Sequence, residues 1–297
     1  MLNQFQIKYL VYLLGIGFLI KIGQILFPQL QSTLEIILLF TGLLFTGIPH
    51  GALDHYVAKK NASNNNTIFN LIPFIIRYII LMMLYGVLWW LVPGLSLCFF
   101  IFLTAFHFGE TDFHFFNFNN KPKAFIYGLS LTAWLLLSHQ IELLKWIHLI
   151  IPKTDSIYIL THYLFKIPSI LFLILCGFLS FPKKPLRIEW VLLQLVLLLA
   201  NQLGLIGGFA FYFSGWHGWQ AFNDIKKHIG SEKEFTLLWK NAIPFTLMAL
   251  FFLVLVFFVT PSSVWQMYGA PAFIVMISLL TLPHMVVMHP VYKKKVD

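Results

Sequence analysis

Charged residues are scarce in this sequence: they make up 10% of its 297 residues, whereas a soluble domain carries about 25%. Hydrophobic residues make up 59%, and no polar segment is long enough to form a domain of its own. The length alone allows two soluble domains, but this composition argues against them. It is explained if most of the chain faces lipid, so residues 1–297 are predicted to form a single polytopic transmembrane domain.

Cysteine is also scarce, and its absence from polar segments excludes several kinds of site. Cys98 and Cys176 both fall inside apolar runs, so they offer neither a disulfide framework nor a metal-binding spacing. The sequence shows no Ser–His–Asp or Cys–His pattern for nucleophilic catalysis. It also lacks the clustered HxxxH and HxxHH motifs expected of a fatty-acid desaturase.

Apolar stretches of about 20 residues recur from end to end, and each is long enough to cross a membrane. The sequence therefore predicts an all-α integral membrane protein, a bundle of about eight to ten transmembrane helices with a histidine metal site between them. The first stretch has no cleavage signature and is interpreted as a retained helix. The expected spans cover residues 8–28, 33–56, 68–92, 95–118, 124–149, 157–181, 188–206, 208–228, 242–260 and 268–290.

The net charge of +9 comes from short clusters of lysine and arginine between the apolar runs. These clusters follow the second, fourth, sixth, eighth and tenth spans, whereas most of the other connections are nearly bare of basic residues. Positive loops mark the cytoplasmic side of a membrane. The pattern therefore predicts a protein of the cell (inner) membrane with both termini in the cytoplasm, rather than a nucleic-acid-binding protein.

Four histidines lie well inside apolar segments, on spans predicted to run in the same direction: His50, His107, His217 and His284. Three of them precede the next lysine by nine residues, which at about 1.5 Å per helical residue places them roughly 13 Å from the basic rim. His107 precedes its lysine by fourteen. One layer of imidazoles on facing helices can form a metal site, and neutral imidazole suits iron, copper, zinc and nickel. The alternative is that each histidine only bonds to a neighbouring helix.

Acidic residues follow three of these histidines at helical spacing. Asp54 is four residues beyond His50, and Glu110 is three beyond His107. Asp224, seven residues beyond His217, completes the set of acids expected to share a face with a histidine and to orient it by accepting its second N–H. Asp112 lies off that face and is expected to pair elsewhere. The other histidines are expected to have packing or interfacial roles: His55, His114, His139, His148, His162, His228 and His289.

Four stretches carry a resemblance to a known family: PHGALD at 49–54, FHFGETD at 106–112, WH at 216–217 and TLPHMVV at 281–287. In this order they resemble the Brp/Blh family of bacterial membrane β-carotene 15,15′-dioxygenases. The resemblance implies a multi-helix membrane fold and a non-haem Fe(2+) ion held by His50, His107 and His217. It also implies that O2 cleaves the central double bond of β-carotene into two retinals.

The sequence departs from this family at one position. Family members typically carry a second histidine four residues after the one in the WH motif, and here that position is Ala221. By its depth, His284 is the leading candidate for a further ligand. The expected partners are the lipid bilayer, β-carotene and O2, with a retinal-binding rhodopsin as acceptor of the product.

Two other kinds of function remain open at this point. One is a non-catalytic carotenoid- or retinal-binding membrane protein, or a transporter with an intramembrane histidine relay. The other is a different membrane oxidoreductase with a histidine-bound metal, such as a bis-histidine haem protein.

Overall fold

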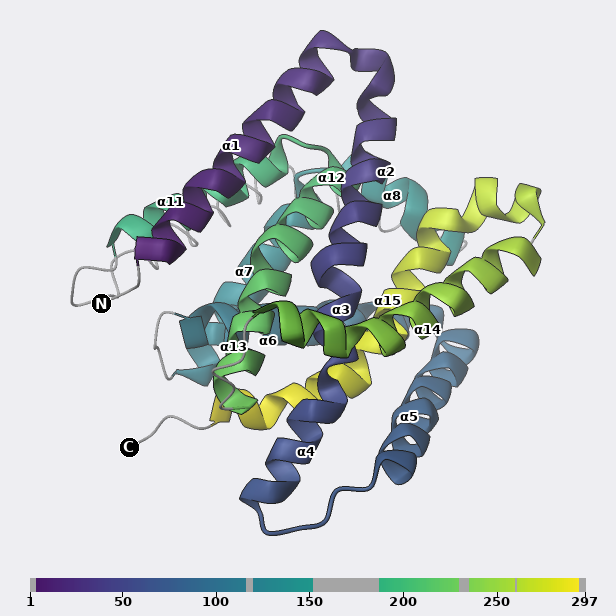
Figure 1. Ribbon diagram of the computed structural model, residues 1–297. Coiled ribbons are helices and arrows are strands. Elements are labelled where there is room, and N and C mark those ends of the chain that lie inside the picture. The colour runs from purple at the N-terminus through teal and green to yellow at the C-terminus, as the bar shows by residue number, and fades with distance from the viewer. Residues whose placement is uncertain (1–3, 116–119, 152–186, 230–234, 260, 294–297) are drawn as a thin grey trace.

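The computed structural model describes residues 4–115, 120–151, 187–229, 235–259 and 261–293, and every regular element in these ranges is helical (Figure 1). The expected all-α class is confirmed. The helices are α1 (Gln4–Leu26), η1 (Pro28–Leu30), α2 (Gln31–Gly42), η2 (Leu43–Gly47), α3 (Ile48–Ala52), α4 (Asp54–Asn64), α5 (Leu71–Leu91), α6 (Pro93–Phe115), α7 (Lys121–Leu137), α8 (Gln140–Ile150), α11 (Arg187–Asn201), α12 (Leu205–Ala210), η5 (Phe211–Gly218), α13 (Trp219–Ile229), α14 (Phe235–Val259) and α15 (Ser262–Lys293).

Five helical stretches in the described residues are long and apolar enough to cross a membrane, which fits a membrane protein. They coincide with the first four predicted spans and the tenth. Two shorter apolar helices lie at the seventh and ninth, and the predicted span 157–181 lies outside the described residues. The five stretches are Ile7–Leu26, Pro28–Asn64, Leu71–Leu91, Pro93–His114 and Pro271–Tyr292.

The predicted span 124–149 is not one continuous helix, because α7 and α8 meet there at an angle of 93°. His139, between them, has a non-helical backbone (φ −117°, ψ 38°). The polar sequence Ser138–His139–Gln140 interrupts the apolar run at this point. The bend brings α8 to the start of α12, where the Leu205 N–H donates to Glu142 Oε2 at 3.4 Å.

Two segments that carry predicted site histidines contain π-helical stretches, η2 before His50 and η5 around His217. These stretches pack closely together. A Cβ on Gly42, the last residue of α2, would lie 2.4 Å from Ser214 Oγ, so any larger residue there would force Ser214 to shift. The Thr46 hydroxyl donates to Ser214 O at 2.7 Å. Because π-helical turns often occur at functional sites, this contact is a natural place to look for chemistry.

The N-terminal helix α1 also holds η5 in place. The Tyr9 hydroxyl donates to Gly215 O, inside η5. The Tyr9 ring stacks on Trp219 at the start of α13, with ring centroids 3.9 Å apart. The partly buried carbonyl inside the π-helix thus has a side-chain partner.

Helices α6 and α7 cross at backbone contact. A Cβ on Gly109 would lie 1.9 Å from Ala124 O, and one on Gly128 would lie 1.8 Å from Ala105 O. Small residues allow membrane helices to approach this closely. The crossing fixes α6, which carries His107.

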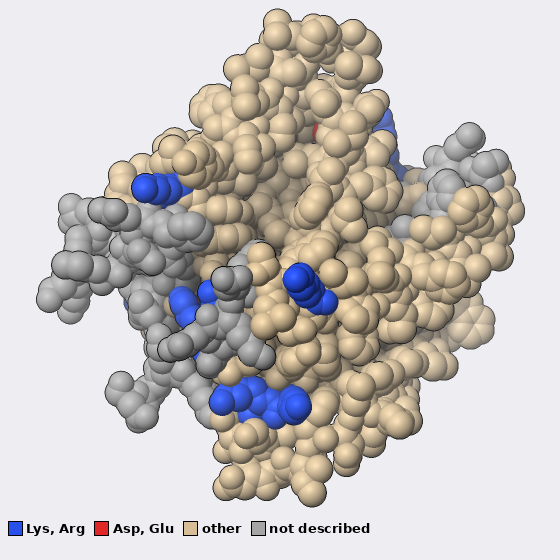
Figure 2. Space-filling model, in the orientation of Figure 1, with Lys and Arg blue, Asp and Glu red and all other residues tan. Residues whose placement is uncertain are grey.

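The buried core lies where these helices converge, and the outer surface is largely apolar. Trp190, Tyr127, Tyr212 and Trp216 are among the largest fully buried side chains. On the face drawn in Figure 2, uncharged residues predominate and the visible Lys and Arg side chains form a few small, separate groups. An apolar exterior around a core with polar groups is what lipid as solvent requires.

Replacing Gly128 by alanine is expected to destabilise the fold by about 1–3 kcal/mol, the usual cost of overpacking, because the new methyl group meets backbone that cannot move aside. The measurement is the midpoint of thermal unfolding in detergent. Gly15→Ala is the control, since nothing outside its own stretch of helix backbone lies within 4 Å of that Cβ position. Equal midpoints for the two variants would contradict the close crossing.

Candidate functional site

The four predicted histidines lie on α3, α6, η5 and α15, and their rings come together. We call His50, His107, His217 and His284 the four-histidine cluster. Going round it, ring centroids lie 4.9 Å apart for His50–His284, 5.1 Å for His284–His107, 4.7 Å for His107–His217 and 5.7 Å for His217–His50. The exposed fraction is 0% for His217 and at most 6% for the others. Four separated segments therefore build one buried group of imidazoles.

Several ring nitrogens in the cluster are buried without a hydrogen-bond partner. They are Nε2 of His107, Nε2 of His284 and both nitrogens of His217. An unsatisfied buried polar group costs about 1–3 kcal/mol, and native structures rarely contain several side by side. Such nitrogens are the donor atoms that a metal ion uses.

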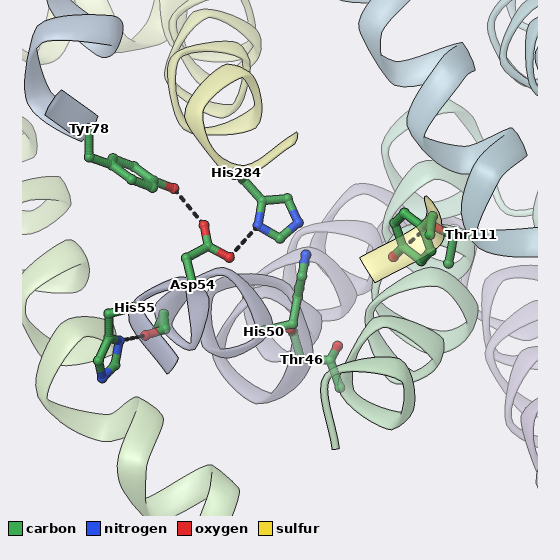
Figure 3. Close-up of polar contacts among 9 residues, drawn as sticks. Thr46, His50, Asp54, His55, Tyr78, Thr111 and His284 are labelled. Atoms are coloured by element: carbon green, nitrogen blue, oxygen red, sulfur yellow. Dashed lines mark hydrogen bonds and ion pairs between the residues drawn. The ribbon is translucent and has the colours of Figure 1, made fainter. Parts of the chain in front are cut away.

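Hydrogen bonds assign the proton on two of the rings. His50 Nδ1 lies 2.8 Å from Thr46 O, and His284 Nδ1 lies 2.8 Å from Asp54 Oδ1 (Figure 3). A carbonyl or carboxylate oxygen only accepts, so each Nδ1 carries a hydrogen and donates it. In the neutral ring Nε2 then keeps its lone pair, which is the form in which imidazole binds a metal.

Among the described residues, no three or more His, Cys, Asp or Glu side chains are arranged to hold a metal ion as they stand. The imidazole pairs of the cluster meet edge to face, with interplanar angles of 74° to 88°. The planes of neighbouring rings therefore differ. Coordination of one ion requires the rings to turn so that their donor atoms converge.

The predicted pairing of each acid with the histidine on its own helix is wrong. Asp54 bonds to His284 instead of His50. Glu110 Oε1 lies 3.5 Å from His289 Nδ1, and Asp224 Oδ2 lies 3.1 Å from His114 Nδ1. The acids therefore link α4 to α15, α6 to α15 and α13 to α6.

The backbone explains why Asp54 does not reach His50. Helical side chains lean toward the N-terminus, and His50 accordingly bonds one turn back, to Thr46 O. Leu53, with φ −87° and ψ 0°, separates α3 from α4, so Asp54 opens a new helix. Its carboxylate is thereby left for partners on other helices.

Asp112 was expected to pair away from His107, and it does so with three donors. The hydroxyls of Tyr127 and Tyr212 donate to its Oδ2 at 2.9 and 3.2 Å. Trp216 Nε1 donates to its Oδ1 at 2.7 Å. Trp216 directly precedes His217, so this buried carboxylate fixes the segment that carries that imidazole.

A polar contact between α6 and α15 lies beside His107. The Thr111 hydroxyl donates to His107 O at 2.9 Å, and Tyr292 OH lies 3.2 Å from the Thr111 oxygen. The Tyr292 ring lies 6.3 Å from that of His107 and 5.3 Å from that of His114. The sequence reasoning missed Tyr292, because a tyrosine at an apolar helix end resembles an interfacial residue.

The other histidines within the described residues lie outside the cluster and have contacts of their own. His55 Nδ1 bonds to Ala52 O at 2.9 Å, and its ring lies 4.6 Å from that of Phe245. His228 Nε2 bonds to Asn61 Oδ1 at 2.8 Å, which joins the ends of α13 and α4. His162 lies outside the described residues.

Ala221, one turn after His217, is fully buried. It supplies no donor atom, and the fourth imidazole of the cluster is that of His284, which lies beside both His50 and His107. The structure thus places His284 where the sequence reasoning sought a further imidazole.

The fold and the site define a class: an all-helical membrane protein with four buried imidazoles from four separated segments. The family model described as beta-carotene 15,15′-dioxygenase matches residues 41–292, which include the whole four-histidine cluster. The chain belongs to this family.

A curated relative is the protein named beta-carotene 15,15′-dioxygenase from the uncultured marine bacterium 66A03, which is 31% identical over 104 residues. The alignment covers 35% of this chain and 38% of that protein, so the chain spans well under half the length of the relative it matches. No solved structure matches the chain.

Replacing Asp112 by alanine is expected to cost at least about 3 kcal/mol, because three buried donors lose their acceptor at about 1–3 kcal/mol each. Tyr127→Phe removes a single hydroxyl from the same network and is expected to cost about 0.5–1.5 kcal/mol. Thermal unfolding in detergent compares them. An Asp112→Ala protein as stable as Tyr127→Phe would show that the carboxylate does not hold η5.

Proposed function

We propose that this chain is a non-haem iron dioxygenase that cleaves the central 15,15′ double bond of β-carotene with O2 and releases two retinals. In this reaction the carbon–carbon double bond breaks, and each of its carbons receives one oxygen atom of O2 as an aldehyde oxygen. The observation that carries the proposal is the four-histidine cluster, buried within the region that matches the family model.

Fe(2+) is the proposed cofactor, held by His50, His107, His217 and His284. The fit is supported by the donor set, since neutral imidazole suits iron, and by the buried nitrogens that have no other partner. When bound, the ion would supply the redox chemistry that allows O2 to react with a polyene. Aspartate and glutamate are not needed as ligands, which agrees with the pairing of the nearby acids to other groups.

The protein side chains orient the imidazole rings and exclude water from the cluster. Thr46 and Asp54 hold the rings of His50 and His284 with Nδ1 as the donor. The rings of Phe108 and Phe213 lie 4.6 and 5.7 Å from that of His217, so apolar surface adjoins the imidazoles. Exclusion of water by such surface strengthens the electrostatic interactions and limits side reactions.

The chemistry of the substrate and product indicates the proposed membrane location and partner of the protein. β-Carotene is apolar and dissolves in the lipid bilayer, which the helices are suited to contact. From the lysine pattern, we place the protein in the cell (inner) membrane with both termini in the cytoplasm. A retinal-binding rhodopsin is the proposed acceptor of the product.

Expression of the chain in β-carotene-producing cells is expected to bleach their orange colour and yield retinal, as measured by absorption and chromatography. His217→Ala is expected to abolish bleaching, because it removes a ring with two unpartnered nitrogens, and His284→Ala is expected to reduce it strongly. His55→Ala is the matched control, since His55 bonds locally to Ala52 O.

Persistent colour at normal protein levels with iron supplied would refute the catalytic proposal. Pigment that copurifies without turnover would instead identify a carotenoid-binding protein. Full bleaching by His284→Ala would exclude that residue as a ligand.

A further inference from the structure

A chain of three side chains reaches the four-histidine cluster from α5. Asp54, the first residue of α4, lies between Tyr78 of α5 and His284 of α15 (Figure 3). The Tyr78 hydroxyl donates to Asp54 Oδ2 at 3.0 Å, and His284 Nδ1–H donates to Asp54 Oδ1 at 2.8 Å. Each carboxylate oxygen therefore has its own donor, although the residues are 24 and 230 positions apart.

This arrangement gives His284 a defined direction. Its Nδ1 is engaged by the carboxylate, and its Nε2 is buried without a partner. The His284 ring lies 4.9 Å from that of His50 and 5.1 Å from that of His107. In Figure 3 its second nitrogen lies on the side of His50. The carboxylate thus holds one nitrogen while the other remains available to the cluster.

His284 differs from its neighbours in the charge of its partner. His50 donates to a neutral carbonyl, and neither nitrogen of His217 is bonded. Within the described part of the chain, His284 is the member of the cluster that bonds to a carboxylate. A carboxylate behind an imidazole raises its basicity as a metal ligand and fixes its tautomer.

Hydrogen bonds other than that of the Tyr78 hydroxyl already attach α5 to its neighbours. Trp89 Nε1 donates to Ser278 Oγ of α15 at 2.7 Å, and Tyr85 OH donates to Ser96 O of α6 at 2.9 Å. Most of α5 is exposed, including Ile76 and Ile79 on either side of Tyr78. Tyr78 turns from this apolar surface toward a carboxylate that is 2% exposed.

We infer that Tyr78 and Asp54 are positioning residues for His284, which keep its Nδ1 protonated and its Nε2 directed into the four-histidine cluster. The inference rests on the proposed function, since it takes His284 as a ligand of the iron. It goes further by assigning a role to α5, a helix that contributes no histidine.

Replacing Asp54 is expected to weaken metal binding more than replacing Tyr78. Asp54→Asn replaces an obligate acceptor by an amide that either donates or accepts, so the tautomer of His284 is no longer fixed. Loss of such a partner typically weakens metal binding about 10–100-fold. Tyr78→Phe leaves the carboxylate in place with one donor fewer, and the expected loss is smaller, on the order of severalfold.

The experiment uses the full chain in detergent without oxygen and without substrate. Fe(2+) and Co(2+) are each titrated against a competing chelator, and the visible absorption of the Co(2+) form reports the ligand field. Wild type, Asp54→Asn and Tyr78→Phe are compared. Tyr85→Phe is the matched control, because it removes a hydrogen-bonded hydroxyl from the same helix without touching Asp54.

We expect weaker metal binding and an altered Co(2+) spectrum in Asp54→Asn and in Tyr78→Phe, with no change in Tyr85→Phe. Unchanged affinity and spectrum in a folded Tyr78→Phe and in Asp54→Asn would overturn it while leaving the proposed function intact. Lower thermal stability with unchanged metal binding would also overturn it, because it would show a purely structural contact. A wild-type chain that binds neither ion would overturn both proposals.

Discussion

The structure depends on one constraint: a polar side chain inside a membrane bundle is costly unless another group satisfies it. Lipid offers no hydrogen bonds, so the partner must come from the protein. Asp112 shows the result, since one carboxylate collects donors from α7 and η5. The same constraint explains why the acids bind to histidines on other helices, where each contact also fixes how two helices are placed.

The four-histidine cluster stands out against this background. Around it, Thr46, Asp54, Glu110 and Asp224 each have a close polar contact, yet several ring nitrogens within it have none. Buried unsatisfied atoms also occur elsewhere in the described residues, for example on Thr104, Gln194 and Ser214, but four of them lie together on the adjacent imidazoles of the cluster. The grouping of these unpaired nitrogens supports a binding role for the cluster better than the number of histidines does.

Much of the fold could be predicted from the sequence, and part of the site. The length of the hydrophobic runs predicted the helical class and five of the ten spans, and matched depth grouped His50, His107, His217 and His284. Pairing could not be predicted in the same way, because helical spacing describes one helix whereas Asp54 and Asp224 contact histidines of other helices. Tyr78 had no local signal, since its direction depends on how α5 packs. The bend at Ser138–His139 was missed because three polar residues barely lower the hydropathy of a long window.

The π-helical stretches have a consequence for how this architecture tolerates change in length. In an α-helix each residue turns the chain by about 100°, so inserting or deleting one residue rotates everything that follows by that angle. The wider turns of η2 and η5 absorb an additional residue locally. They therefore determine the direction, around the helix axis, in which the side chains of His50 and His217 point. A one-residue deletion in either stretch would leave the hydrophobic length of the span almost unchanged and yet turn its imidazole away from the others.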